Sequence, residues 1–298
     1  MRTEHRSVNR EVRILERDDR RYPALLSMTG KSAPPRLYCI GNLSLLRRKA
    51  AAVVGARKAT PYGKWVSYHI GRKLGQYGIV TVSGMAYGCD AEAHRGALSV
   101  GGATIAVLGS GVSVCYPKRN QPLYEEILAK DGLILSEQKP DAVPLPAFFA
   151  ERNRIISGLS LVVVVTEAGL SSGSLITAEY AAEQGRTVMA VPGNMNSLSS
   201  IGCNKLIQDG ASIVTGLGDI LEELGIQADP DDESKMMELS QRERDIFNLI
   251  RNSGEVSLNL ISRETGLSIA GVNAVAAQLE IRGFIVSSMG KAFVAKPV

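Results

Sequence analysis

Short apolar segments alternate with longer amphipathic segments through the middle of the chain. The apolar segments are rich in valine and isoleucine, a composition typical of buried strands. They predict strands at residues 51–54, 79–82, 104–108, 133–135, 161–165 and 187–191, with a weaker one at 212–214. Because each pair is separated by a helix-sized segment, we expect an α/β domain built on a parallel sheet with helices packed against it.

Nearly every predicted strand ends in glycine or a small polar residue. Gly55-Ala56-Arg57, Ser83-Gly84, Gly109-Ser110-Gly111, Glu167-Ala168-Gly169 and Pro192-Gly193 follow five of these strands. In an open parallel sheet, ligands bind outside the carboxyl ends of the strands, where loops and helix N-termini meet. We therefore expect the functional site at these loops.

The last part of the chain has a different pattern. Three amphipathic helices are predicted from residue 240 to residue 282, and two short apolar segments around Gly290 predict a hairpin. This order is that of a winged helix. The third predicted helix is residues 269–282, and the segment that would read DNA, residues 268–280, contains no lysine or arginine. Since a helix in the DNA major groove ordinarily carries basic or amide side chains, a protein-contact or weak accessory role is favoured.

These patterns divide the chain into four parts. We expect a basic N-terminal tail at residues 1–21, a Rossmann-like domain at 22–224, an acidic linker at 225–237 and a winged-helix domain at 238–298. The formal net charge is +4, but residues 36–221 carry 18 Lys and Arg against 13 Asp and Glu. The central domain is therefore the basic one, which favours an anionic partner.

Composition excludes several classes of protein. With 298 residues, 45% of them hydrophobic and 21% charged, the chain is neither disordered nor a coiled coil. The longest strongly apolar run, 161–165, is far shorter than the roughly 20 residues that cross a bilayer. Because the N-terminus also lacks an apolar signal sequence, we expect a cytoplasmic protein that does not enter a membrane.

Cys39, Cys89, Cys115 and Cys203 lie far apart, so neither disulfides nor a zinc site is expected.

Basic and amide side chains recur just beyond the predicted strand ends. They are Arg57 and Lys58, then Lys118, Arg119 and Asn120, then Arg152, Asn153 and Arg154. The neighbouring glycines let backbone N–H groups approach phosphate oxygens, and arginine presents a planar fork that holds two oxygens. Any one of these residues could merely solubilise the surface. Together they favour a polyanion as the ligand.

Catalytic and cofactor motifs are scarce. The chain has no Walker loop, and Gly109-x-Gly111 lacks the third glycine of a dinucleotide site. No serine occupies a nucleophile elbow, and no cluster of Asp, Glu and His has metal spacing. Asp90 and His94, four residues apart, could share a helix face, but a helix cap above a packed histidine is the favoured interpretation. We expect no cofactor, no metal and no catalytic group.

Six ordered motifs resemble those of the DNA-processing protein A family, also called DprA or Smf. They are Gly55-Ala56-Arg57, the segment from Ser83-Gly84 to His94, Tyr116-Pro117-x-x-Asn120, Arg152-Asn153-Arg154 with the residues to Ser160, Glu167-Ala168 with the residues to Ala178, and Ala190-Val191-Pro192-Gly193. The resemblance extends from Tyr22 to about Leu224. It implies an extended Rossmann-like domain that binds single-stranded DNA (ssDNA), usually as a homodimer, and helps to load the RecA recombinase in transformation or recombination. Family members are not known as enzymes.

The resemblance also assigns roles to residues. It implies that Arg57 binds a DNA phosphate, with Lys58 beside it, and that Arg152 and Arg154 line the same pocket. Lys118, Arg119 and Asn120 would extend the track, while Gly84, Gly88, Gly173 and Ser174 would bring backbone amides close to it. Phe149 would be either a base-stacking platform or a core residue at a helix start.

Two further expectations follow. Only 21 residues precede Tyr22, so the helical N-terminal domain of many family members is expected to be absent. The alternative function is that of a nucleoside-monophosphate phosphoribohydrolase, because residues 167–179 loosely resemble the P-G-G-x-G-T-x-x-E segment of these enzymes. Glu179 would then assist cleavage of the N-glycosidic bond.

Overall fold

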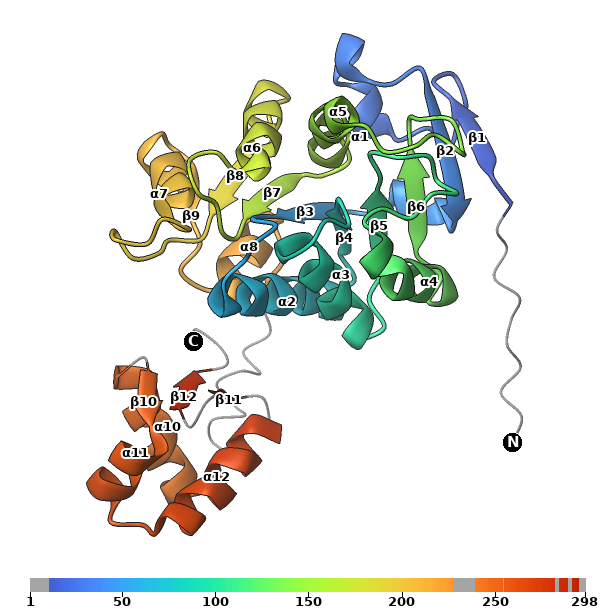
Figure 1. Cartoon of the computed structure of the whole chain (residues 1–298). Coiled ribbons are helices and arrows are strands. Elements are labelled where there is room, and N and C mark those ends of the chain that lie inside the picture. Colours follow the sequence, from blue (N-terminus) through green and yellow to red (C-terminus); the bar gives the residue numbers. More distant parts are fainter. Residues whose placement is uncertain (1–10, 228–238, 254, 282–283, 289–290, 295–298) are drawn as a thin grey trace, which may run out of the picture. The chain divides into compact units, whose positions relative to one another are not determined.

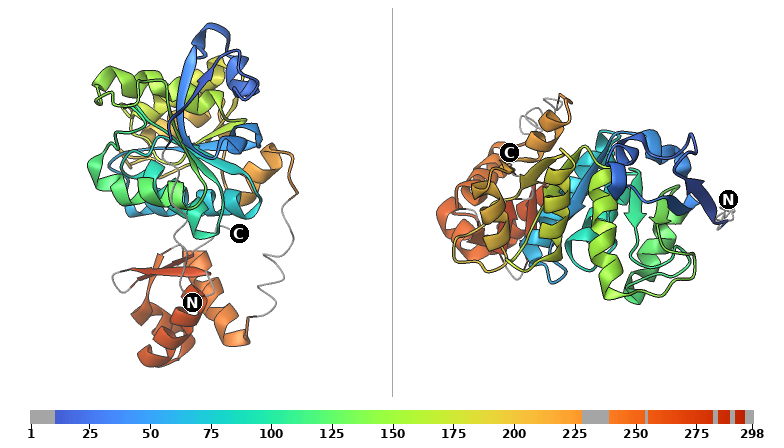
Figure 2. Two further views of the ribbon diagram at one scale, coloured as in Figure 1. Left: turned by 90° about the vertical axis from the view of Figure 1, so that its right-hand side faces the viewer. Right: turned by 90° about the horizontal axis from the view of Figure 1, so that it is seen from above.

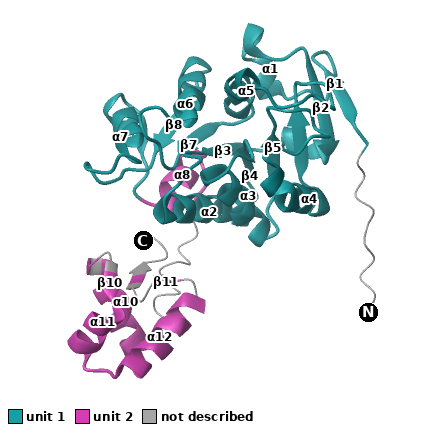
Figure 3. Cartoon of the chain, viewed as in Figure 1, with its two compact units in different colours: residues 1–215 teal, residues 216–298 magenta. Residues whose placement is uncertain are grey.

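The computed structural model describes residues 11–227, 239–253, 255–281, 284–288 and 291–294. These residues form two compact units, residues 1–215 and 216–298, coloured separately in Figure 3. The predicted linker, 225–237, lies for the most part outside the described residues, as do the first ten residues of the predicted tail.

The described residues of the first unit form one nine-stranded sheet with helices on both faces (Figure 1). Its strands run in the order β1-β2-β6-β5-β4-β3-β7-β8-β9. The strands are β1 (Arg13–Glu16), β2 (Arg36–Gly41), β3 (Ala50–Val54), β4 (Val80–Ser83), β5 (Thr104–Val107), β6 (Leu133–Ser136), β7 (Val162–Val165), β8 (Thr187–Ala190) and β9 (Ser212–Ile213). All pairs from β6 to β9 are parallel, and this confirms the predicted α/β sheet.

Helices cover the sheet in two layers. Figure 1 shows α2 (Pro61–Gln76), α3 (Cys89–Ser99) and α4 (Gln121–Ala129) below the sheet, and α5 (Pro146–Gly158), α6 (Gly173–Glu183) and α7 (Ile201–Gln208) above it. The view from above shows the upper layer lying over the sheet (Figure 2, right). Shorter pieces are α1 (Ala24–Ser27), η1 (Gly30–Ser32), η2 (Leu43–Arg47) and η3 (Lys118–Asn120). Because both faces are covered, β3 and β7 consist entirely of buried alanine and valine.

The order of the strands places a switch point between β3 and β7. From β3 the chain runs outward through β4 and β5 to β6, then returns to β7 on the other side of β3. The loops after β3 and β7 therefore diverge, and ligands of open α/β sheets bind in the crevice that such a divergence leaves. The central strands thus form a Rossmann-like sheet, and the predicted binding loops after β3 and β7 lie at its switch point.

Two antiparallel strands extend this sheet beyond the predicted ones. β1 pairs with β2, and β2 pairs with β6. The sequence pattern did not indicate either strand. β1 has the sequence Arg-Ile-Leu-Glu, of which Leu15 alone is fully buried, so that it resembles the charged segment around it. At the edge of a sheet one face of a strand meets solvent, and its hydrophobic signal is correspondingly weak.

The second unit has its own core. It contains α8 (Leu217–Glu223), α10 (Gln241–Ser253), α11 (Leu258–Thr265) and α12 (Ile269–Ile281), with the antiparallel sheet β10-β12-β11 formed by Glu255–Ser257, Lys291–Val294 and Ile285–Ser288. Phe247 and Phe284 pack edge to face, with ring centroids 5.7 Å apart. Three helices followed by a hairpin match the predicted order; the assignment of this unit to the winged-helix class stays a prediction.

We expect a chain that ends at residue 235 to fold. The buried clusters of the first unit lie between Leu15 and Cys203, and that of the second unit lies between Leu239 and Ala292, so the two cores share no residue. Circular dichroism and thermal unfolding of the shortened chain should therefore give a single cooperative transition. An aggregated or non-cooperatively unfolding product would contradict the separation of the cores.

Candidate nucleic-acid interface

A cavity of about 570 Å³ lies at the switch point between β3 and β7. Its walls come from four places: the loop after β3, the start of α3 with the loop before it, α5, and the loop after β7 with the first turn of α6. Of the predicted site residues, it is lined by Arg57, Lys58, Phe149, Arg152, Gly173 and Ser174. The structure therefore brings half of the predicted set into one cavity.

Arg57 is an exposed cation that lines this cavity. Its guanidinium carbon lies 5.3 Å from the centroid of the Phe149 ring, within the range of a cation–π contact. Lys58, the next residue, is also exposed, and within the described part of the chain it makes no ion pair. Both cations are thus available to an anionic ligand.

Arg152 is buried, with only 4% of its surface exposed. Its Nη1 donates hydrogen bonds to the backbone carbonyl of Gly84, at 2.8 Å, and to that of Val107. A Cβ at position 84 would meet the guanidinium at 2.5 Å, so the glycine is needed for this close approach. Burial lowers the pKa of Arg152 to about 10, and the nearby Asp90 carboxylate opposes that shift. Arg152 therefore ties the loop after β4 to the end of β5.

Arg152 also lines the cavity, although little of its surface is exposed. Its Nη2 has no hydrogen-bond partner among the described residues. It is not one of the fully buried side-chain atoms that lack a hydrogen-bond partner. Since Arg152 lines the cavity, this nitrogen can donate to a ligand there. The residue thus combines a structural role with a binding one.

Asp90 organises the loop beneath the cavity. Its carboxylate accepts a hydrogen bond from the Gly84 amide at 3.1 Å, and the amides of Gly55 and Ala86 also bond to it. Burial raises its pKa, whereas Arg152 and these amides lower it. Gly88, at φ 74°, is the N-cap of α3, and a Cβ there would meet the backbone of Ala56 and Arg57. Asp90 therefore lies in the first turn of α3 rather than at its cap, and it fixes the glycine-rich loop.

The N-terminus of α6 supplies further donors. Gly173 begins the helix, and the Ser172 side chain makes no capping bond to the backbone amides of the first turn. Instead the Ser172 and Ser174 hydroxyls bond to each other at 2.8 Å, and Asn153 Nδ2 donates to the Gly173 carbonyl at 3.1 Å. Free amides and the helix dipole favour an anion at such a terminus. The sequence-predicted pair Gly173 and Ser174 thus has a physical basis for binding phosphate.

Lys118, Arg119 and Asn120 lie outside the cavity in η3. Asn120 is buried, and its Nδ2 donates to the carbonyls of Met85, at 2.8 Å, and Ala86, at 3.4 Å. Lys118 and Arg119 are exposed and have no ion-pair partner among the residues that the structure describes. Asn120 therefore holds the loop after β4, while the two cations can extend the site beyond the cavity.

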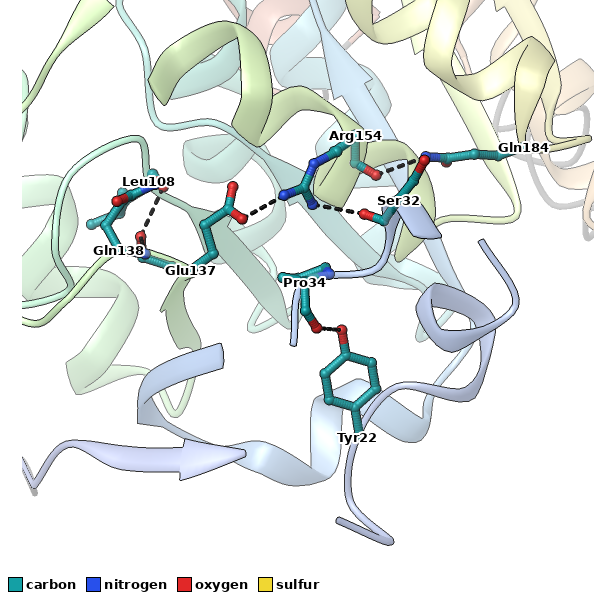
Figure 4. A network of polar contacts seen from close by, with 9 residues as sticks. Tyr22, Ser32, Pro34, Leu108, Glu137, Gln138, Arg154 and Gln184 are labelled. Atoms are coloured by element: carbon teal, nitrogen blue, oxygen red, sulfur yellow. Dashed lines mark hydrogen bonds and ion pairs between the residues drawn. The ribbon is translucent and has the colours of Figure 1, made fainter. Parts of the chain in front are cut away.

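Arg154 lies away from the cavity. Figure 4 shows its guanidinium between the Ser32 carbonyl, at 2.8 Å, and the Glu137 carboxylate, with which it forms an ion pair. Residues two apart on an α-helix point about 200° apart, so Arg152 and Arg154 of α5 cannot both enter one pocket. The structure brings Arg152 to the cavity and leaves Arg154 in a partly exposed polar network with Ser32 and Glu137.

Three residues at or beside the cavity were not assigned individual roles from the sequence, although Asn153 belongs to the predicted basic and amide set. Tyr116, in a quoted motif, packs against Phe149 with ring centroids 5.3 Å apart. Asn153 and Asp90 hold the α6 terminus and the glycine-rich loop, respectively. Their positions inside the motifs were a signal that these residues lie near the site, but only side-chain geometry shows what each one contacts.

His94 lies below the glycine-rich loop and is fully buried, as the packed interpretation predicts. Its Nδ1 lies 2.6 Å from the Thr104 hydroxyl, and Nε2 has no partner among the described residues. Burial, with Arg152 and Arg95 nearby, lowers its pKa to about 3. His94 is therefore neutral near pH 7 and carries no charge to the site.

We expect His94 to make stability depend on pH between about 3 and 6.5. In this window the unfolded histidine binds a proton that the folded one does not, so stability falls as pH falls, by up to about 1.4 kcal/mol per pH unit. Urea unfolding of the wild type and of His94→Asn, from pH 4 to pH 7, should show a shallower slope for the variant. Asp90 has the opposite sign but is common to both chains. Parallel slopes would contradict a buried, neutral His94.

The described residues give little support for a metal site, a membrane span or the alternative enzyme. Among the described residues no cluster of His, Cys, Asp and Glu could hold a metal, and no helix is long and apolar enough to cross a bilayer. Glu179, the candidate acid of the alternative enzyme, is exposed on α6 and does not line the cavity. The carboxylate that does line it, Asp90, is held by backbone amides.

Comparison with known proteins gives a consistent family. Residues 13–225 match the family model described as DNA recombination-mediator protein A. The DNA processing protein DprA of Streptococcus pneumoniae is 46% identical over 191 residues, which are 64% of this chain and 67% of that protein. The protein Smf of Escherichia coli is 36% identical over 285 residues, which are 93% of this chain and 76% of that protein.

Solved structures agree with these sequence matches. An X-ray structure of DprA from Streptococcus pneumoniae has a TM-score of 0.68 at 44% identity, covering 72% of this chain and 75% of that one. A structure of DNA processing protein A from Helicobacter pylori, described for its single-stranded DNA binding mode, has a TM-score of 0.65 at 32% identity. It covers 73% of this chain and 97% of that one.

Proposed function

Because this chain belongs to the DNA recombination-mediator protein A family, we propose that it binds single-stranded DNA at the cavity between β3 and β7. One observation carries the proposal. Groups that donate to phosphate reach this cavity from three elements: Arg57 from the loop after β3, Arg152 Nη2 from α5, and the open N-terminus of α6. Donors from separate elements suit several phosphates of one strand better than a single phosphate.

The proposed contacts follow from these positions. Arg57, Lys58 and Arg152 would bind phosphates within the cavity, as would the amides at Gly173 and Ser174. Lys118 and Arg119 would bind phosphates beyond it. Gly84, Gly88 and Asn120 would act by shaping the loop after β4, and Phe149 by packing against Arg57. The relative from Helicobacter pylori, described as binding single-stranded DNA, supports this choice of ligand.

We further propose that the protein is a binding and transfer factor rather than an enzyme. It would act in the cytoplasm as a homodimer, through the Rossmann-like unit, and deliver single-stranded DNA to the RecA recombinase. The family description as a recombination mediator supports this role. The exposed position of Glu179, outside the cavity, is unfavourable to the phosphoribohydrolase alternative.

Fluorescence anisotropy with a labelled 20-nucleotide oligo-dT tests the binding proposal. We expect tight binding of the oligonucleotide, weaker binding of a duplex of equal length, and no release of adenine from AMP by the same preparation. A duplex bound more tightly than the single strand, or turnover of AMP, would overturn the proposal in favour of the other function.

A further inference from the structure

The Phe149 ring is largely occupied by the protein itself. Arg57 lies over it at 5.3 Å, and the Tyr116 ring lies beside it, 5.3 Å away between centroids at an angle of 39°. Gly109 lies against its edge, because a Cβ there would come within 2.7 Å of Phe149 Cδ1. Three neighbours thus hold this half-buried ring and leave little of it for a nucleobase.

Tyr116 is the more accessible ring of the pair. It is 42% exposed, lies in the segment between β5 and η3, and does not line the cavity. Its hydroxyl makes no hydrogen bond among the described residues. An exposed tyrosine whose ring packs against another ring presents a flat surface at little entropic cost, as base-stacking platforms do.

The position of Tyr116 connects two groups of cations. Arg57, on the cavity side, packs against Phe149, which packs against Tyr116. Lys118 and Arg119 follow Tyr116 by two and three residues, and both are exposed. A phosphate contact, an aromatic surface and two more cations therefore follow one another along the edge of the sheet.

We propose that Tyr116 stacks on a base of the bound strand and that the strand leaves the cavity over this residue toward Lys118 and Arg119. Phe149 is then a positioning residue that fixes the Arg57 guanidinium and the Tyr116 ring side by side. This inference rests on the proposed binding of single-stranded DNA, and it adds the path of the strand and the residue that contacts its bases.

The experiment combines a protein change with a base change. Anisotropy titrations compare the wild type, Tyr116→Ala, Tyr116→Leu and Tyr116→Phe on two 12-nucleotide strands, oligo-dT and the same backbone without bases. On oligo-dT we expect the alanine and leucine variants to bind about 5- to 30-fold more weakly, and the phenylalanine variant to bind like the wild type. On the abasic strand all four should bind alike, because no base is present to stack.

Tyr62→Ala is the matched control. Tyr62 is 52% exposed on α2 and does not line the cavity, so its loss should leave both affinities unchanged. Thermal unfolding identifies any variant that fails to fold, and Tyr116→Leu retains the apolar contact with Phe149 if the alanine variant does not fold.

The outcomes separate this inference from the function on which it rests. If the wild type binds neither strand, the proposed function itself fails. If the wild type binds oligo-dT and the Tyr116 variants bind it equally well, only the path over Tyr116 is wrong. Equal losses on oligo-dT and on the abasic strand would also overturn stacking, since Tyr116 would then act through the backbone or the fold.

Discussion

Arg152→Ala should lower the free energy of unfolding of the α/β unit by about 3 to 5 kcal/mol, the cost of removing one partner of a buried charged network. The substitution leaves the carbonyls of Gly84 and Val107 without their donor, leaves Asp90 without a nearby cation, and opens a cavity where the guanidinium lay. Urea unfolding followed by circular dichroism measures the loss.

Arg154→Ala is the matched control for this change. Arg154 lies two residues away on the same helix, but its side chain is 19% exposed and pairs with Glu137, 14% exposed, near the surface. Its loss should cost about 1 to 2 kcal/mol, because solvent partly screens the pair. Equal losses for the two variants would show that Arg152 is not the internal tie between β4 and β5 that its contacts indicate.

Arg57→Ala should weaken oligo-dT binding by about 10- to 150-fold, or about 1.5 to 3 kcal/mol, the range for a hydrogen bond to a charged group. The free energy of unfolding should stay the same, since Arg57 is exposed and, in the described structure, contacts the protein through the face of Phe149. Anisotropy at fixed salt measures the affinity. Arg57→Lys should recover part of it, because lysine keeps the charge without the planar fork.

The control for Arg57 is another exposed arginine of the same unit. Arg36 lies on β2, paired with Glu16, and does not line the cavity. Arg36→Ala removes the same charge and should change the affinity little. A similar loss in both variants would mean that net charge, rather than contact at the cavity, governs binding.

The parallel strands could be predicted because burial on both faces produces continuous apolar segments in the sequence. The valine run of β7 and the alanine and valine run of β3 contain no polar residue, and the glycines that follow mark where each strand ends. The loops that line the cavity could be singled out for the same reason, since the carboxyl ends of parallel strands share one edge. β1 was missed because its sequence, Arg-Ile-Leu-Glu, buries a single side chain and so resembles the charged segment around it.

The different contacts of the basic residues could not be predicted from the sequence. Arg152 and Arg154 differ by two positions in sequence, yet one binds the carbonyls of two strand ends and the other an acid on the far side of the helix. Tyr116 is a further case, because its contact with Phe149 joins segments more than thirty residues apart. Such roles depend on which side chain faces which neighbour, and motif spacing does not encode that.

The length and salt dependence of binding tests the central claim most directly. Labelled dT strands of one to twenty nucleotides should bind more tightly as they lengthen, until the track from the cavity to Lys118 and Arg119 is filled. With at least three phosphates engaged, the logarithm of the binding constant should fall against the logarithm of salt with a slope of about −2 or steeper, at roughly −0.7 per phosphate. Equal affinity from one nucleotide to twenty, with a slope of about one phosphate, would contradict a single-strand track and indicate a mononucleotide pocket.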